Sequence, residues 1–154
     1  MKLLNFGSLN IDYVYDMPHF VQGGETATAT ARHVYAGGKG LNQSIAAARA
    51  GAQVLHAGAI GPDGAFLTQL LEDAGADTSA LLQVQEASGH AMIQVTPEGQ
   101  NAIIVYGGAN HCLTEAYVQS VLRQAEPGDL VLLQNETSQT AQIIAQAADL
   151  GLRV

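Results

Sequence analysis

The segment Ala36-Gly37-Gly38-Lys39-Gly40-Leu41-Asn42-Gln43 constrains the fold most strongly. Its three glycines allow a ligand to approach the backbone closely, and the helix predicted after them offers unpaired N–H groups to oxygen-rich molecules. The spacing excludes a P-loop, because His33 and Gly40 occupy the positions of the first glycine and the hydroxyl residue. It also excludes the dinucleotide pattern, since Gln43 stands where a glycine or alanine is needed. A ligand-binding loop is one interpretation, and an ordinary strand-to-helix loop is the other.

Strand-like and helix-like segments alternate on both sides of this loop. Apolar strands are predicted at residues 2–9, 53–60, 81–84 and 130–133, and residues 152–154 look like the start of another. Helices are predicted at residues 41–50, 65–74, 114–125 and 140–150, with Thr114 and Ser138 as caps for the last two. The alternation predicts an α/β fold with a largely parallel sheet, and ligands bind at the carboxyl ends of such strands.

Two further stretches do not fit the alternation. Residues 26–31 read Thr-Ala-Thr-Ala-Thr-Ala, and this period-two pattern within residues 25–35 is typical of a strand with one polar and one small face. Residues 90–96 and 101–106 are predicted to form a hairpin that offers Met92 and Ile104 to a core. Together these stretches predict a small separate sheet, a candidate lid.

Composition and charge narrow the class of protein. A chain of 154 residues suits one domain, and 47% hydrophobic with only 13% charged residues excludes intrinsic disorder. Six basic against fourteen acidic residues give 6 − 14 = −8, without a basic stripe, so nucleic acid is not an expected partner. The single cysteine, Cys112, fits a reducing compartment. No signal peptide or apolar run of ~20 residues is visible, so we expect a cytoplasmic protein without a membrane partner.

Polar side chains follow two of the predicted strands. Asn10 and Asp12 are two residues apart, so an extended backbone places both on one side, where they can bind vicinal hydroxyls. A turn is the alternative and is favoured for this segment taken alone. Glu136 follows the strand at 130–133, so its carboxylate would lie at the carboxyl end of the sheet, where ligands bind. A carboxylate that stabilises the N-terminus of the next helix is an about equally good explanation.

The remaining reactive side chains form no recognisable site. The histidines, His19, His33, His56, His90 and His111, lack metal-ligand spacing, and Cys112 has no partner thiol, so no metal is expected. His111 and Cys112 are adjacent, and adjacent side chains usually point apart, so a nucleophile and base pair is not favoured.

These fragments together resemble the N-terminal half of the ribokinase-like, PfkB-type carbohydrate kinases. The resemblance rests on Gly7-Ser8-x-Asn10-x-Asp12, Gly24-Glu25-Thr26, the Gly37 to Gln43 block continuing through Ala52, Gly108-Ala109-Asn110, and Glu136. Their order and spacing match over essentially the whole chain, and Gln43 favours the ribokinase branch over the phosphofructokinase-like one.

The resemblance implies a three-layer α/β/α fold with a small β-sheet lid and an ATP-dependent transfer of a phosphoryl group to a primary hydroxyl of a sugar. Residues 1–154 would be the N-terminal part of one such domain, with lid segments at about 13–36 and 89–106. The residues implied to bind a ribose-like sugar are Asn10, Asp12, Gly38, Lys39, Asn42 and Glu136. A homodimer formed through the lid would follow.

The catalytic part of the family pattern does not occur in these 154 residues. The Gly-Ala-Gly-Asp-type segment that carries the base, the magnesium-linked Asn-x-x-Glu segment and the nucleotide pocket have no counterpart. We therefore expect no catalytic residue in this chain, which would be inactive alone, and place most of the ATP and Mg²⁺ sites outside it. A nucleoside kinase of the same family and a non-catalytic sugar-binding or truncated module remain alternatives.

Overall fold

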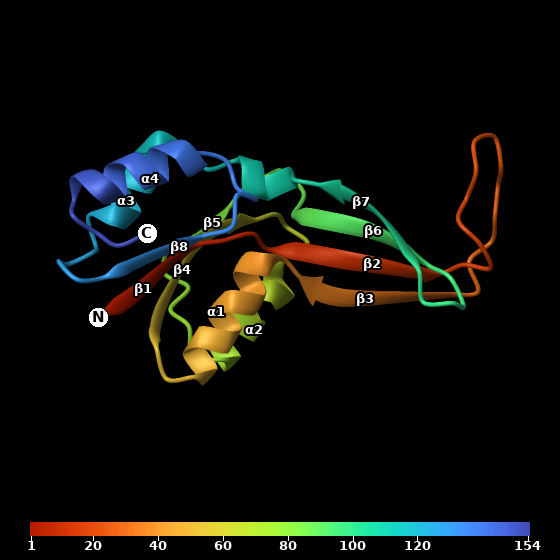
Figure 1. The fold of residues 1–154 in the computed structure, drawn as a ribbon, viewed down its shortest axis with the longest axis horizontal. Coiled ribbons are helices and arrows are strands. Elements are labelled where there is room, and N and C mark those ends of the chain that lie inside the picture. The colour runs from red at the N-terminus through yellow and green to blue at the C-terminus, as the bar shows by residue number, and fades with distance from the viewer.

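Four parallel strands form the central sheet, in the order β5-β4-β1-β8. The computed structural model describes residues 1–154. The strands are β1 (Lys2–Phe6), β4 (Gln53–Ile60), β5 (Leu81–Gln83) and β8 (Leu130–Leu133). Helices α1 (Lys39–Arg49) and α2 (Ala65–Asp73) cover one face, and α3 (Glu115–Leu122) and α4 (Thr140–Asp149) cover the other (Figure 1).

A second sheet extends away from this core (Figure 1). Its order is β3-β2-β6-β7, and the strands are β2 (Asn10–Asp16), β3 (Ala31–Gly37), β6 (Gly89–Val95) and β7 (Asn101–Tyr106). β2 pairs parallel with β6, whereas the β2–β3 and β6–β7 pairs are antiparallel. The predicted α/β fold, with a parallel sheet and a small additional sheet, is therefore confirmed, and the additional sheet is mixed.

Two apolar clusters hold the three layers together. Leu4 and Phe6 of β1 are fully buried on one side of the sheet with Val118 of α3 and Ile143 of α4. On the other side a separate cluster includes Leu41 of α1. Because successive strand residues point to opposite faces, β1 contributes to both clusters. None of the helices is long and apolar enough to cross a membrane.

Several predicted boundaries are wrong. The strand expected at 2–9 ends at Phe6, and the segment for which a turn was favoured continues as β2 from Asn10. Thr114 does cap α3, because its hydroxyl accepts a hydrogen bond from the Tyr117 N–H, but the helix ends at Leu122. Ser138 does not cap α4, since its hydroxyl donates instead to the carbonyl of Leu113, 3.0 Å away.

The Thr/Ala segment is also not a strand over most of its length. β3 begins only at Ala31, which lies opposite Asp16, the last residue of β2. Residues 25–30 have no strand opposite them, and an alternating pattern without a partner cannot form a ladder.

The hairpin is correct within one residue, but its apolar side chains are not buried. Met92 is 46% exposed and Ile104 is 66% exposed. These two residues are register partners on neighbouring strands, and no helix or strand packs over them. Val21 and residues 27–29 of the β2–β3 loop only flank them, around a hollow. The prediction that they enter a core is wrong for this chain.

Candidate functional site

The site lies where the connection between β1 and β2 meets the start of α1. The N–H of Leu41 donates to the carbonyl oxygen of Ser8, 3.0 Å away. A Cβ at Gly40 would lie 2.3 Å from the Cα of Gly7, and a Cβ at Gly7 would lie 2.6 Å from the Cα of Gly40. Only glycine at both positions permits this backbone contact.

Gly38 gives the loop its shape. Its φ of +98° is unfavourable for other residues, and a Cβ there would lie 2.6 Å from the carbonyl oxygen of Ser8. Lys39 follows it, and its side chain projects to the end of β8. The glycines predicted to allow close approach of a ligand therefore first serve the close approach of two backbone segments.

Glu136 joins three segments of the chain. Its carboxylate forms an ion pair with the amino group of Lys39 and accepts a hydrogen bond from the hydroxyl of Ser8 at 2.7 Å. Burial raises the pKa of Glu136, but the hydrogen bonds from Lys39 and Ser8 outweigh it and hold the pKa below its usual value. The carboxylate is therefore charged at neutral pH and held in a fixed position beside the loop.

Asn10 and Asp12 lie on the same face of β2, as their spacing predicts. The carboxylate of Asp12 lies across Gly37, where a Cβ would come within 2.2 Å of its Oδ2 atom. Partial burial raises the pKa of Asp12. No side chain or N–H of the chain donates a hydrogen bond to this carboxylate, so its oxygens are free to accept hydrogen bonds from a ligand.

Asn110 fixes the start of β2. Its amide accepts a hydrogen bond from the Leu9 N–H at 2.9 Å and donates to the Leu9 carbonyl at 3.2 Å and to Asn10 Oδ1 at 2.8 Å. A Cβ at Gly89 would lie 2.0 Å from the Asn110 amide nitrogen, so glycine is required there as well. The sequence analysis used the segment Gly108-Ala109-Asn110 only as part of the family resemblance and predicted no role for Asn110.

A hollow of about 200 Å³ opens between the two sheets at this point. Its lining residues are Ser8, Asn10, Val105, Gly107, Asn110, His111 and Glu136. The structure thus brings the predicted residues Asn10 and Glu136 to one hollow. Lys39 is joined to it only through its ion pair with Glu136, and Gly38 only through its approach to Ser8. Asp12 lies farther along β2, and Asn42 lies exposed on the first turn of α1. Neither of these two lines the hollow.

A buried polar cluster that the sequence analysis missed lies behind the loop. Asn5, Ser44 and His56 are fully buried. The amide of Asn5 donates to the Gly40 carbonyl at 2.9 Å and to the Ser44 hydroxyl at 2.7 Å, and the Ser44 hydroxyl lies 2.7 Å from His56 Nδ1. His56 Nε2 lies 3.2 Å from the Gly7 carbonyl. The cluster therefore ties together the two backbone segments that meet at the site.

The hydrogen bonds assign the protonation of His56. Since the Gly7 carbonyl can only accept, Nε2 carries the proton, and Nδ1 accepts from Ser44. Burial lowers the pKa of His56 to about 4, so the ring is neutral at neutral pH. The Gln134 side chain extends the cluster by donating to Asn5 at 2.7 Å and to Gln43 at 2.9 Å.

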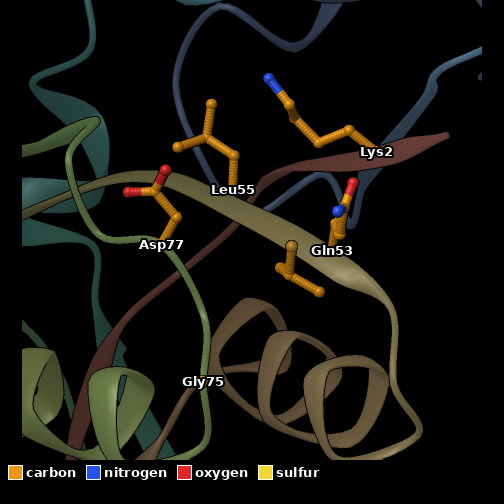
Figure 2. Close-up of a pocket in the computed structure, with 6 residues that line it drawn as sticks. Lys2, Gln53, Leu55, Gly75 and Asp77 are labelled. Carbon is orange, nitrogen blue, oxygen red and sulfur yellow. The ribbon is translucent and has the colours of Figure 1, made fainter.

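A larger hollow, about 370 Å³, lies at the opposite end of the central sheet. Figure 2 shows Lys2, Gln53, Leu55 and Asp77 around it, close to the first residues of β1 and β4. Lys2 already donates from its amino group to the Gln124 carbonyl at 3.1 Å. Ligands of open α/β sheets bind at the carboxyl ends of the strands. The hollow lined by Ser8, Asn10 and Glu136 is therefore the better candidate.

Residues 1–150 match the family described as pfkB family carbohydrate kinase. The ribokinase of Haemophilus influenzae is 40% identical over 134 residues, which cover 85% of this chain and 44% of that protein. A ribokinase structure from Cryptococcus neoformans in complex with ADP is similar with a TM-score of 0.80 and 39% identity, over 96% of this chain and 46% of that one.

A third similar structure is that of Arabidopsis thaliana ribokinase complexed with ribose and ATP. Its TM-score is 0.79 at 27% identity, over 98% of this chain and 51% of that one. The chain spans about half the length of the relatives it matches.

Proposed function

Because the chain belongs to the PfkB family of carbohydrate kinases, we propose that it provides the sugar-binding half of an ATP-dependent kinase that phosphorylates a primary hydroxyl of a pentose such as ribose. One observation carries the proposal: Asn10 and Glu136, which is paired with Lys39, line one hollow beside the carboxyl ends of β1 and β8. Residues 1–154 would then be the N-terminal part of one ribokinase-like domain.

The predicted site residues, of which Asn10 and Glu136 line the hollow, suit a polyhydroxylated ligand. Asp12 and Glu136 offer carboxylate oxygens that accept hydrogen bonds from hydroxyl groups, and such charge-assisted bonds are the stronger kind. Lys39 and Asn42, both exposed, offer donors from the first turn of α1. Asn10 is fixed by Asn110, so its orientation is set before a sugar binds. These residues would bind and orient the sugar, and phosphoryl transfer depends almost entirely on such positioning.

The nucleotide and the catalytic base belong, in this proposal, mostly to residues outside this chain. The similar proteins from C. neoformans and A. thaliana were solved with ADP and with ATP, which supports a nucleotide as phosphoryl donor. Within these 154 residues no group of three or more His, Cys, Asp or Glu side chains is placed to hold a metal ion. The residues present thus do not form a magnesium site, and we derive no step through one.

The second sheet would act as the lid over the sugar, through segments at about 13–36 and 89–106. Its face with Asn10 and Asp12 borders the hollow, whereas its other face carries the exposed side chains of Met92 and Ile104. We propose that this second face packs on the same face of another copy, giving a homodimer. Ile104→Asp is expected to convert the dimer to a monomer in sedimentation experiments, and a wild-type monomer at micromolar concentration would contradict the dimer.

The test of the function compares Asp12→Ala with wild type in the complete protein that contains this chain. Loss of a charged partner of a buried hydroxyl should weaken ribose binding by ~1.5–3 kcal/mol, or roughly 10- to 150-fold in KM. Asp149→Ala removes an exposed carboxylate at the far end of α4 and serves as the matched control. Equal KM values for wild type and Asp12→Ala would contradict the assigned role.

The same assay separates the alternatives. Tighter competition by adenosine or inosine than by ribose would identify a nucleoside kinase instead. Binding of ribose without any turnover by the complete protein would identify a non-catalytic sugar-binding module. Absence of binding by every sugar and nucleoside would overturn the proposed function as a whole.

A further inference from the structure

His111 is the lining residue of the hollow to which the proposed function gives no role. It ends the short 3₁₀ turn at Gly108–His111, and its side chain is exposed. It lines the same hollow as Asn10 and Glu136. Its ring borders this hollow and the neighbouring hollow beside Tyr106 and Cys112, so a ligand in the first can reach it.

The ring of His111 is the only imidazole of the chain without a hydrogen-bond partner. The nearest partners of the other four are 2.6 to 3.1 Å from a ring nitrogen: Glu25 for His19, Asp16 for His33, Ser44 for His56 and Ser88 for His90. A neutral imidazole carries one donor and one acceptor, and both are free at His111. A sugar hydroxyl, which both donates and accepts, matches either nitrogen.

Gly107 makes room for this ring. A Cβ at position 107 would lie 2.3 Å from Cε1, 2.5 Å from Nδ1 and 2.7 Å from Nε2 of His111. The ring therefore lies directly over the Cα of Gly107, and any larger residue would displace it. The same arrangement holds Asp12 over Gly37, and it holds Asn110 over Gly89. The His111 ring, like the Asp12 carboxylate and the Asn110 amide, thus occupies space that is open only because a glycine lies beside it.

We propose that His111 is a further sugar-binding residue, whose imidazole hydrogen-bonds one hydroxyl of the sugar and so helps to determine which sugar is accepted. This inference rests on the proposed function and names an additional contact of the same site. The hollow, about 200 Å³, is smaller than the ~300–1,000 Å³ of pockets for drug-sized ligands, which suits a monosaccharide.

The experiment measures phosphorylation kinetics of the complete protein with ribose and with 1-deoxy-, 2-deoxy- and 3-deoxyribose. His111→Ala should raise the KM for ribose about 3- to 12-fold, the loss expected for one neutral hydrogen bond, with kcat changed less. For the one deoxy sugar that lacks the contacted hydroxyl, His111→Ala and wild type should have equal KM values. His111→Gln keeps a donor and an acceptor and should recover part of the affinity.

A second variant tests whether the position of the His111 ring over Gly107 matters for sugar binding. Gly107→Ala retains the imidazole but displaces it, so it should reproduce the rise in KM of His111→Ala. Gln119→Ala, an exposed polar residue of α3 away from the hollow, is the control and should match wild type. Thermal melting of each variant verifies that it folds.

The outcomes distinguish this inference from the proposed function. If wild type phosphorylates ribose and His111→Ala changes the KM less than twofold for every sugar, the role of His111 is refuted and the proposed function stands. A uniform loss with all four sugars also refutes a hydroxyl contact, because it would show a general effect on the site. If wild type phosphorylates no sugar, both proposals fail together.

Discussion

Acidification is expected to destabilise the protein through His56 between about pH 6.5 and pH 4. Burial lowers the pKa of His56 from 6.5 to about 4. In this window the unfolded chain binds a proton at His56 that the folded protein does not, so the free energy of unfolding decreases as the pH falls. The gap of about 2.5 pH units corresponds to roughly 3 kcal/mol, present in full above pH 6.5 and lost by about pH 4.

The buried hydrogen bonds explain why the folded protein resists this proton. A protonated ring would present a donor to Ser44 as well as to Gly7, and the Ser44 hydroxyl would have to turn away from Nδ1. That hydroxyl is already held by the Asn5 amide at 2.7 Å. A charge at this fully buried position would also have no acidic partner, because the two ring nitrogens bond only to the Ser44 hydroxyl and the Gly7 carbonyl.

The assay is urea unfolding at a series of pH values from 7.5 to 4, followed by circular dichroism, on wild type and on His56→Gln. Glutamine does not titrate, so the variant should lack the histidine contribution, while other acid-sensitive groups cancel in the difference. The wild type should lose roughly 3 kcal/mol more than the variant over the window. Parallel pH dependences of the two proteins would refute the reasoning, since they would show that His56 binds its proton equally in both states.

Three more predictions concern the site. Gly40→Ala should lower the melting temperature by roughly 2 to 12 °C, because its methyl group would lie 2.3 Å from the backbone of Gly7; an unchanged melting curve would contradict the contact. Lys39→Met removes the ion pair, so the pKa of Glu136 should rise in an NMR titration, and an unshifted titration would show that the pair does not form. Asn110→Ala leaves the N–H and carbonyl of buried Leu9 unpaired and should reduce the free energy of unfolding by ~1–3 kcal/mol in urea, against little change for Gln119→Ala.

The central sheet was predictable because its signals are local. β4 and β8 have the predicted bounds, since each is a continuous apolar run between turn-forming residues. The errors arise where a partner decides the outcome. Residues 25–30 alternate like a strand but have no strand beside them, and Met92 looks like a core residue but lies on an uncovered face.

The candidate site was predictable only in part for the same reason. Asn10 and Glu136 were predicted from their positions after strands, and Lys39 from the glycine-rich loop and the family resemblance. The structure brings Asn10 and Glu136 to one hollow and pairs Glu136 with Lys39, and their binding of a sugar stays a prediction. The buried cluster of Asn5, Ser44 and His56 was not foreseen, because its bonded neighbours are 39 and 12 residues apart in the sequence and share no sequence pattern. His111 was set aside as the neighbour of Cys112, whereas its environment is created by Gly107 and by residues distant in the sequence.

The short connection between the two sheets has a mechanical consequence. Only Gly7, Ser8 and Leu9 separate β1 from β2, and Asn10, where β2 begins, is the register partner of both Gly37 and Gly89. Asn10, which lines the hollow, is thus the natural pivot for a rigid-body rotation of the second sheet. Seven extended residues span about 23 Å, so a rotation of about 10° at this pivot displaces the distal end of β2 by about 4 Å while Asn10 itself moves by less than about 1 Å. A rotation about Asn10 would therefore displace the far end of the sheet most, where Figure 1 shows the longest loop of the chain.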